Sequence, residues 1–176
     1  MSPRNVLYGA LAAVCRPGPP RVTPRLVAVS GGFDPLHEGH VRYLQAATLL
    51  GEALVVFLNS DAWLVRKKGY RVFTWDQRRE LLLALRSVTT VVPVDDGDGT
   101  VALALRLWRP HIFAKGGDRT DWSRMPAAER RAASVVGCQV VFGVGSKPAS
   151  SSHLIRSAPH SMSVTATRRV RKSHPR

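Results

Sequence analysis

Cysteine, long apolar runs and acidic side chains are all scarce in this sequence of 176 residues. The two cysteines, Cys15 and Cys138, form no CxxC or metal-binding spacing, so reduced thiols in a cytoplasmic protein are expected. No apolar run approaches the ~20 residues that a membrane-spanning helix needs, so we expect no membrane partner. These absences argue against a disulfide-stapled secreted scaffold and against a helical membrane protein.

Basic residues are what the chain has in excess, since 26 lysines and arginines against 12 acids give a net charge of +14. A charge of this size can indicate nucleic acid, a membrane surface or small polyanions such as phosphates. Residues 159–176 carry several arginines, no acid and few large apolar side chains, which predicts a disordered basic tail. Nucleic acid binding through this tail is therefore one hypothesis for the chain.

The remaining composition predicts a single folded domain. A hydrophobic fraction of 44% is ordinary for a protein with a buried core. The run Pro-Gly-Pro-Pro at positions 17–20 breaks regular structure, so residues 1–24 are interpreted as an N-terminal extension and residues 25–158 as the domain.

Short apolar runs alternate with helical patterns along the domain, and this alternation predicts an α/β fold: a Rossmann-like parallel sheet with helices on both faces. Strands are expected at residues 26–29, 53–58, 88–94, 111–114 and 139–144. Helices are expected at 39–50, from 75 onward with Leu81, Leu82 and Leu85 on the apolar face, at 101–108, at 126–136 and from 150 onward. Dense polar clusters follow the strands at residues 31–40, 59–68, 115–118 and 145–152, with a basic loop at 66–69. Ligands of such sheets bind beyond the carboxyl ends of the strands, so we expect these clusters to line one site.

The segment from Leu26 to Leu44 carries the clearest chemistry. A short apolar strand leads into a turn with two glycines, and a helix start then presents His37 and His40 three positions apart. Glycines let backbone N–H groups approach an anion, and the N-terminus of a helix favours negative charge. Side chains at i and i+3 share one helix face, so both imidazoles can reach the same phosphate.

Five motifs follow one another along the domain: Gly32-Phe33-Asp34-Pro35-Leu36-His37-Glu38-Gly39-His40, Asn59-Ser60-Asp61 with Lys67-Lys68-Gly69, Gln77-Arg78, Lys115-Gly116-Gly117-Asp118 and Ser150-Ser151-Ser152-His153-Leu154-Ile155-Arg156. In this order they resemble the HxGH nucleotidyltransferase superfamily, in its cytidylyltransferase-like branch, over about Pro24 to Ser157. The Asn-Ser-Asp and Lys-Gly-Gly-Asp motifs look most like the sugar-phosphate adenylyltransferase that makes ADP-heptose, and glycerol-3-phosphate cytidylyltransferases are the alternative.

The resemblance implies transfer of the NMP part of ATP or CTP to a phosphorylated sugar or alcohol, with release of pyrophosphate. The attacking phosphate is already an anion, so no general base is needed, and catalysis is positioning plus stabilisation of charge. Mg²⁺ is the implied cofactor because it offsets triphosphate charge. The implied partners are a nucleoside triphosphate, a phosphorylated small-molecule acceptor and a second copy of the chain in a homodimer.

The same resemblance implies roles for individual residues. His37 and His40 would donate to the phosphates, and Lys67 or Lys68 would reach in from a mobile loop. Arg78 and Lys115 would hold the acceptor phosphate, with the triphosphate as the other ligand open to Lys115. The implied nucleotide-binding set is Gly31, Gly32, Phe33, Asp34, Lys115, Gly116, Asp118, Ser150, Ser151, Ser152 and Ile155.

Structural alternatives stand beside these roles. Asp34 is open either as a cap of its turn or as a metal ligand, and Asp118 is equally open as the metal ligand. The lysine pair is open as a solvated loop, Arg78 as a surface charge of its helix, and the serine run as a flexible linker.

Overall fold

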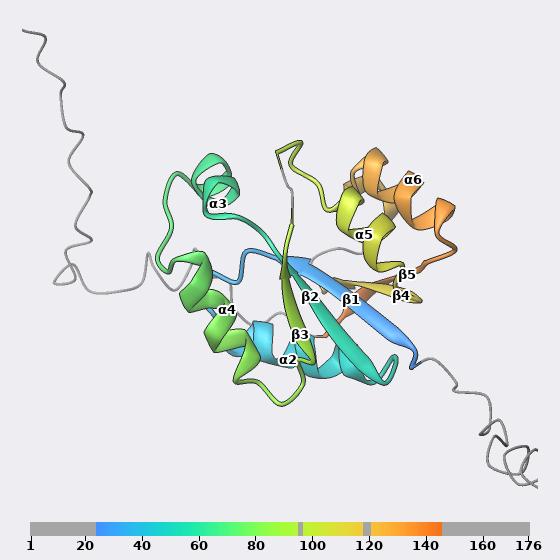
Figure 1. The fold of residues 1–176 in the computed structure, drawn as a ribbon, viewed down its shortest axis with the longest axis horizontal. Helices are drawn as coiled ribbons and strands as arrows, with labels where there is room; N and C mark the ends of the chain where they lie inside the picture. Colours follow the sequence, from blue (N-terminus) through green and yellow to red (C-terminus); the bar gives the residue numbers. More distant parts are fainter. Residues whose placement is uncertain (1–23, 95–96, 118–120, 146–176) are drawn as a thin grey trace, which may run out of the picture.

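The fold, a computed structural model, is described over residues 24–94, 97–117 and 121–145. A five-stranded sheet in the order β3-β2-β1-β4-β5 forms its centre, and every neighbouring pair of strands is parallel (Figure 1). The prediction of a Rossmann-like parallel sheet with helices on both faces is confirmed. The strands are β1 (Leu26–Gly31), β2 (Ala53–Leu58), β3 (Thr90–Pro93), β4 (Ile112–Gly116) and β5 (Gln139–Val144). The helices are α2 (Glu38–Thr48), α3 (Asp61–Lys68), α4 (Trp75–Leu83), α5 (Ala102–Trp108) and α6 (Ala127–Val135), with a 3₁₀ turn η1 (Trp122–Arg124).

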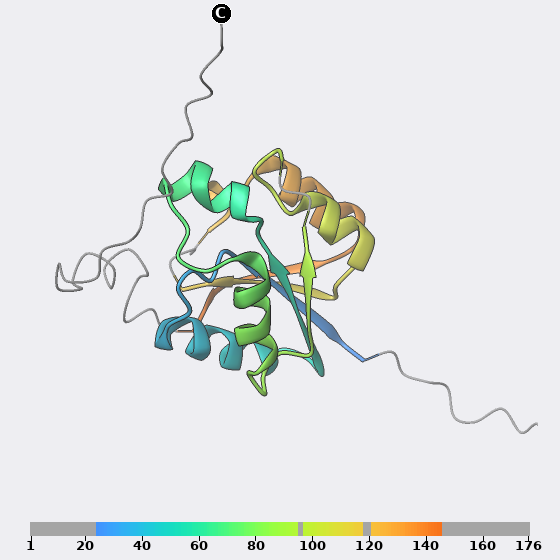
Figure 2. The same cartoon turned by 60° about the vertical axis from the view of Figure 1, so that its left-hand side comes forward.

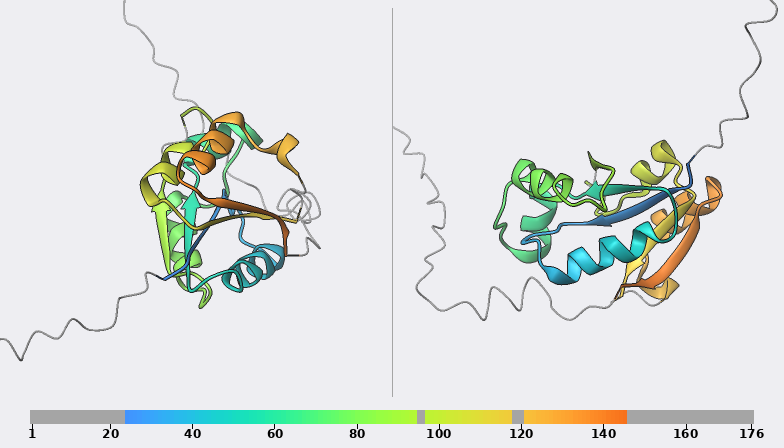
Figure 3. Two further views of the ribbon diagram at one scale, coloured as in Figure 1. Left: turned by 90° about the vertical axis from the view of Figure 1, so that its right-hand side faces the viewer. Right: turned by 90° about the horizontal axis from the view of Figure 1, so that it is seen from below.

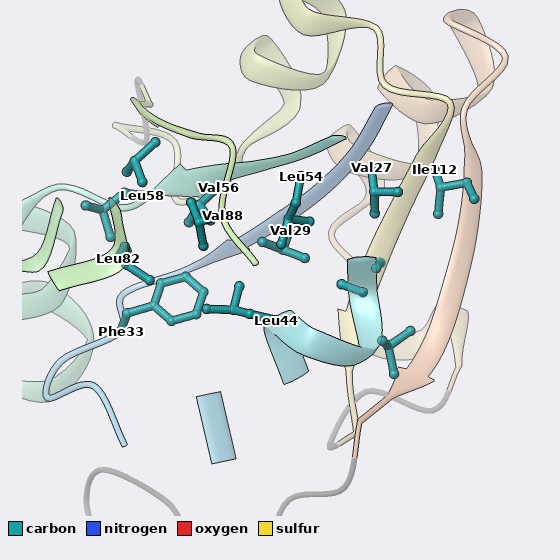
Figure 4. Close-up of a cluster of buried hydrophobic side chains, with 14 residues drawn as sticks. Val27, Val29, Phe33, Leu44, Leu54, Val56, Leu58, Leu82, Val88 and Ile112 are labelled. Carbon is teal, nitrogen blue, oxygen red and sulfur yellow. The ribbon is translucent and has the colours of Figure 1, made fainter. Parts of the chain in front are cut away.

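Two hydrophobic clusters lie on opposite faces of the sheet, because successive strand side chains alternate between the faces. Val27 and Val29 of β1 pack with Leu44 of α2 and Leu82 of α4, a cluster that Figure 4 shows in close-up. Ala28 belongs to the second cluster, with residues of α5 and α6. Helices α2 and α4 therefore cover one face and α5 and α6 the other, as the views in Figures 2 and 3 also show.

The direction of the chain crossovers reverses between β1 and β4. Helices α2 and α4, which follow β1 and β2, lie on one face, whereas α6, which follows β4, lies on the other. The carboxyl ends of all strands lie at one edge because the sheet is parallel. Helices α2 and α6, which follow the neighbouring strands β1 and β4, diverge at this edge. In doubly wound sheets this switch point is where a crevice opens for ligands.

Helix α3 corrects the prediction of a basic loop at residues 66–69. Ser60 caps the helix by accepting a hydrogen bond from the Trp63 N–H through its side chain, and Gly69 ends it with φ +83°. Asp61 in the first turn and the basic residues of the last turn both complement the helix dipole. The Asn-Ser-Asp sequence is thus a helix start, and the lysines belong to a helix.

Helix α4 gives a second correction. Leu82 is fully buried, but Leu81 is 42% exposed and lies off the apolar face on which it was expected. Arg78 and Leu82, one turn apart, are the buried residues of this helix. Other boundaries differ little, although the third strand is limited to Thr90–Pro93 and its expected first residue, Val88, is buried in the preceding turn.

Within the described ranges, no helix has both the length and the apolar character needed to cross a membrane. The N-terminal extension, the basic tail and the helix expected from residue 150 lie outside the described residues, so the proposed domain limits stay predictions.

Candidate active site

His37 and His40 lie together where α2 begins, beyond the carboxyl end of β1. His37 is the N-cap residue, and its Nδ1 accepts a hydrogen bond from the Gly39 N–H at 3.1 Å. The two imidazole rings stack with centroids 3.8 Å apart and planes 26° from parallel. Because Nδ1 of His37 accepts this hydrogen bond, the neutral ring carries its own proton on Nε2.

The turn between β1 and α2 is held by close packing. Phe33 has a positive φ of 48°, a strained conformation for this residue. Its ring packs edge-to-face with that of His40, with ring centroids 5.0 Å apart. A Cβ on Gly32 would lie 2.6 Å from the Leu64 side chain, and one on Gly31 would lie 3.1 Å from the Phe33 ring. A side chain at Gly32 would therefore require Leu64 to move, and one at Gly31 would require a small shift of the Phe33 ring, a packing constraint separate from the predicted approach of an anion.

Asp34 is fully buried, and its carboxylate joins two distant segments of the chain. One oxygen accepts the Val72 N–H at 2.7 Å and the other accepts the Phe73 N–H at 2.8 Å. Both carboxylate oxygens thus accept hydrogen bonds from the backbone. No group of three potential metal ligands was found among the described residues. The assignment of Mg²⁺ to Asp34 stays a prediction, and Asp118, the other open assignment, lies outside the described residues.

The structure separates the two candidate lysines. The Lys67 ammonium lies 4.4 Å from the centroid of the Trp63 ring, and its side chain is exposed. Lys68 is half-buried, and its Nζ donates to the backbone oxygen of Asp34 at 2.8 Å. Burial lowers the pKa of Lys68 from 10.5, and the nearby Asp34 charge partly opposes this shift. Lys68 is therefore the lysine that contacts the histidine-bearing turn, and it does so from helix α3.

Arg78 is buried under the ends of β1 and β2. Its Nη1 donates to the Gly32 oxygen at 2.6 Å, and Nη2 donates to the Asn59 oxygen at 3.0 Å and to Asp61 Oδ1 at 2.8 Å. The side chain is fully inaccessible to solvent. The guanidinium thus ties two strand ends together, which corrects the reading of Arg78 as a surface charge. Its predicted contact with an acceptor phosphate stays a prediction.

Lys115 lies in β4 and points to the opposite face from α2. Its Nζ is 2.7 Å from Glu129 Oε2 of α6 and 4.1 Å from the centroid of the Phe113 ring. Both charged side chains are buried, and Glu129 also accepts the Val101 N–H at 3.2 Å. Sequence reasoning missed Glu129, although its placement three and four positions before the buried Ala132 and Ala133 marks the same inward face of α6.

The predicted site residues therefore fall into two groups across the β1/β4 switch point. Side chains that follow β1 and β2 gather with the glycine turn on the side of α2 and α3, whereas Lys115, with Gly116 after it, ends β4 toward α6. Tyr43, which the sequence did not single out, joins α2 to β4 by donating to the Ala114 oxygen at 2.7 Å. The first group is Gly31, Gly32, Phe33, Asp34, His37, His40, Lys68 and Arg78. Asp118, Ser150, Ser151, Ser152 and Ile155 lie outside the described residues.

Comparisons with known proteins match most of the domain. The family model described as cytidylyltransferase-like matches residues 28–158. Bifunctional protein HldE of Pelobacter propionicus is 45% identical over 97 residues, which is 54% of this chain and 20% of that protein. Bifunctional protein HldE of Geotalea uraniireducens is 40% identical over 139 residues, 78% of this chain and 26% of that protein. The chain thus spans about a quarter or less of the length of these curated relatives.

A solved structure agrees with the fold. The lipopolysaccharide core biosynthesis protein of Thermoplasma volcanium GSS1 superposes with a TM-score of 0.58 at 27% identity, covering 72% of this chain and all of that one.

Proposed function

Since this chain belongs to the cytidylyltransferase-like family, we propose that it transfers the nucleoside monophosphate part of ATP or CTP to a phosphorylated sugar. A phosphate oxygen of the acceptor attacks the α-phosphorus of the nucleotide, a new P–O bond forms, and the bond to the β-phosphate oxygen breaks with loss of pyrophosphate. The nucleophile is an anion from the start, so the protein needs to align the reactants and stabilise charge.

The observation that carries this proposal is the stacked pair His37 and His40 at the start of α2, beside the switch point. The ring of His37 presents an Nε2–H donor, fixed by the Gly39 hydrogen bond on its other nitrogen. Donors placed where charge develops on the phosphates lower the barrier without reorganising during the reaction. Lys68 adds a positive charge on the same side, held at the Asp34 oxygen.

The acceptor class is proposed from the resemblance of the sequence to sugar-phosphate adenylyltransferases and from relatives named HldE. Glycerol 3-phosphate as acceptor, with CTP, is the alternative within the same chemistry. Polynucleotide binding by residues 159–176 stays a separate prediction, and removal of these residues should abolish it while leaving nucleotidyl transfer intact.

The Mg²⁺ requirement also stays a prediction. Mg²⁺ commonly binds substrate phosphates together with one or two carboxylates. Among residues 24–94, 97–117 and 121–145, the described part of the chain, no cluster suits a metal and both oxygens of Asp34 are engaged. We therefore assign no protein ligand to the ion.

A pyrophosphate-release screen tests the proposal. ATP and CTP are each combined with sugar 1-phosphates, other sugar phosphates and glycerol 3-phosphate. His37→Ala and His40→Ala should each lower kcat by about a hundredfold, the typical loss when one charge-stabilising donor is removed. His111→Ala is the matched control, because this exposed histidine lies at the opposite edge of the sheet, where its Nδ1 accepts the Leu26 N–H at 3.0 Å, so its loss bears on stability and not on the site. Release with glycerol 3-phosphate alone would favour the alternative acceptor, and no release with any pair would refute the function.

A further inference from the structure

We propose that Asp34 is a positioning residue of this site, whose carboxylate fixes the segment 69–74 to the histidine-bearing turn and thereby sets the position of Lys68. The segment 69–74 joins α3 to α4 and is called the α3–α4 linker below. The inference rests on the proposed nucleotidyl transfer, because Lys68 acts on phosphate only if that function holds.

Three hydrogen bonds converge on Asp34. Its two carboxylate oxygens accept the N–H groups of Val72 and Phe73 in the linker at 2.7 Å and 2.8 Å. Its backbone oxygen accepts the ammonium of Lys68, the last residue of α3, at 2.8 Å. Asp34 thus contacts the residue that precedes the α3–α4 linker and two residues near the linker's other end.

The other neighbours of Asp34 connect this attachment to the imidazoles. The preceding residue, Phe33, lies at a positive φ and packs its ring against His40. A shift of the Asp34 backbone would therefore be felt at both His40 and Lys68. Misplacement by about 1 Å of groups that align reactants can cost a hundredfold in rate, so the connection bears on catalysis.

The side chain needs to be a carboxylate for a simple reason. Two N–H donors approach two oxygens, and an ionised carboxylate is the side chain that accepts at both. An asparagine of the same shape has one oxygen and one NH₂ group, so one linker N–H would face another donor. The buried position of Asp34 gives water little opportunity to replace the lost partner.

The test compares Asp34→Asn with Asp76→Asn, a control at an exposed aspartate in the first turn of α4. In Asp34→Asn we expect amide hydrogen exchange at Val72 and Phe73 to quicken by about tenfold or more, as for loss of about 1.4 kcal/mol of local stability. We expect kcat to fall by about tenfold or more while KM for the nucleotide stays within about twofold. The control should leave all three quantities unchanged.

A double-mutant cycle with Lys68→Met separates positioning from a purely structural role. If Asp34 acts through Lys68, Asp34→Asn should lower kcat far less in the Lys68→Met background than in the wild type. Equal losses in both backgrounds, or faster exchange with unchanged kcat, would overturn the proposal. Val72→Pro deletes one of the two N–H donors without altering the buried carboxylate, and it replaces Asp34→Asn in the cycle if that variant does not fold.

Failure of the proposed function gives a different result. Absence of transfer in the wild type refutes the function. The rate of amide hydrogen exchange at Val72 and Phe73, read by mass spectrometry, then tests the attachment without turnover. It should rise in Asp34→Asn and stay constant in Asp76→Asn, and an unchanged rate in Asp34→Asn would refute the attachment itself.

Discussion

Replacement of Arg78 by methionine should destabilise the domain strongly although no ligand is involved. Methionine keeps much of the aliphatic stem but removes the guanidinium, which donates to Gly32, Asn59 and Asp61 from a position closed to solvent. Two backbone oxygens at the ends of β1 and β2 then lose a charged donor. Arg78 thus adds a side-chain link to the backbone hydrogen bond from the Asn59 N–H to the Gly31 oxygen, which joins the same strand ends.

The magnitude follows from the partners. A hydrogen bond to a charged group contributes about 1.5–3 kcal/mol, and two carbonyl oxygens lose theirs. Asp61 is 35% exposed and also lies 3.5 Å from Arg71, so water and that arginine compensate its loss. Removal of the desolvation cost of a buried guanidinium offsets part of the total. We expect a decrease of about 3 kcal/mol in the free energy of unfolding.

Urea denaturation measures this change. With a urea m-value of about 2 kcal/mol/M, the midpoint of Arg78→Met should fall by about 1.5 M at unchanged m. Arg79→Met is the matched control, because this neighbouring arginine of α4 is exposed and its loss should cost less than about 0.5 kcal/mol. A decrease below about 1 kcal/mol for Arg78→Met, or an equal decrease for both variants, would refute the reasoning.

Three further predictions follow from other buried groups. Glu129→Gln leaves the Lys115 ammonium buried without its countercharge and should cost about 3–5 kcal/mol in urea unfolding, and a loss no larger than that of the exposed Glu80→Gln would contradict the pairing. Burial lowers the pKa of Lys68 below 10.5, so between its folded pKa and 10.5 the unfolded chain binds more protons and stability rises with pH. Lys68→Met should remove this part of the pH slope, and urea unfolding free energies with identical pH slopes in both proteins would show the shift to be absent. Burial raises the pKa of the Cys138 thiol to about 11, so alkylation followed by mass spectrometry should be slow at about pH 8 and quicken toward pH 11, whereas rapid labelling at about pH 8 would show the thiol to be accessible and ionised.

The strands were predictable because apolar residues fill most of the length of each one. The segment Ala-Leu-Val-Val-Phe-Leu, for example, is β2 from Ala53 to Leu58. Helix α3 escaped prediction because its apolar residues are consecutive, at positions 62–65, and show no helical period, although Ser60 and Gly69 are typical of a helix start and end. Local signals at the two ends were stronger evidence there than periodicity.

The roles of charged residues were harder to predict because they depend on partners far along the chain. Asp34 binds N–H groups 38 and 39 positions away, and no spacing within the sequence reveals that contact. Lys115 was predicted to hold a phosphate, and the structure shows that its ammonium pairs with Glu129 on α6, the side to which the alternation of strand side chains turns it. The sequence located the edge of the sheet where the site lies, and the partners of each charge required the structure.

Nucleotidyl transfer that depends on charge stabilisation by the histidine pair at the start of α2 is the proposed activity. Its most direct test is to follow label from ATP or CTP carrying a labelled α-phosphate into a nucleotide sugar, with the wild type, His40→Ala and the control His111→Ala. The account predicts labelled product from the wild type and the control, and about a hundredfold less from His40→Ala. Label transfer that is equal in all three proteins, or absent from the wild type with every sugar phosphate and with glycerol 3-phosphate, would contradict it.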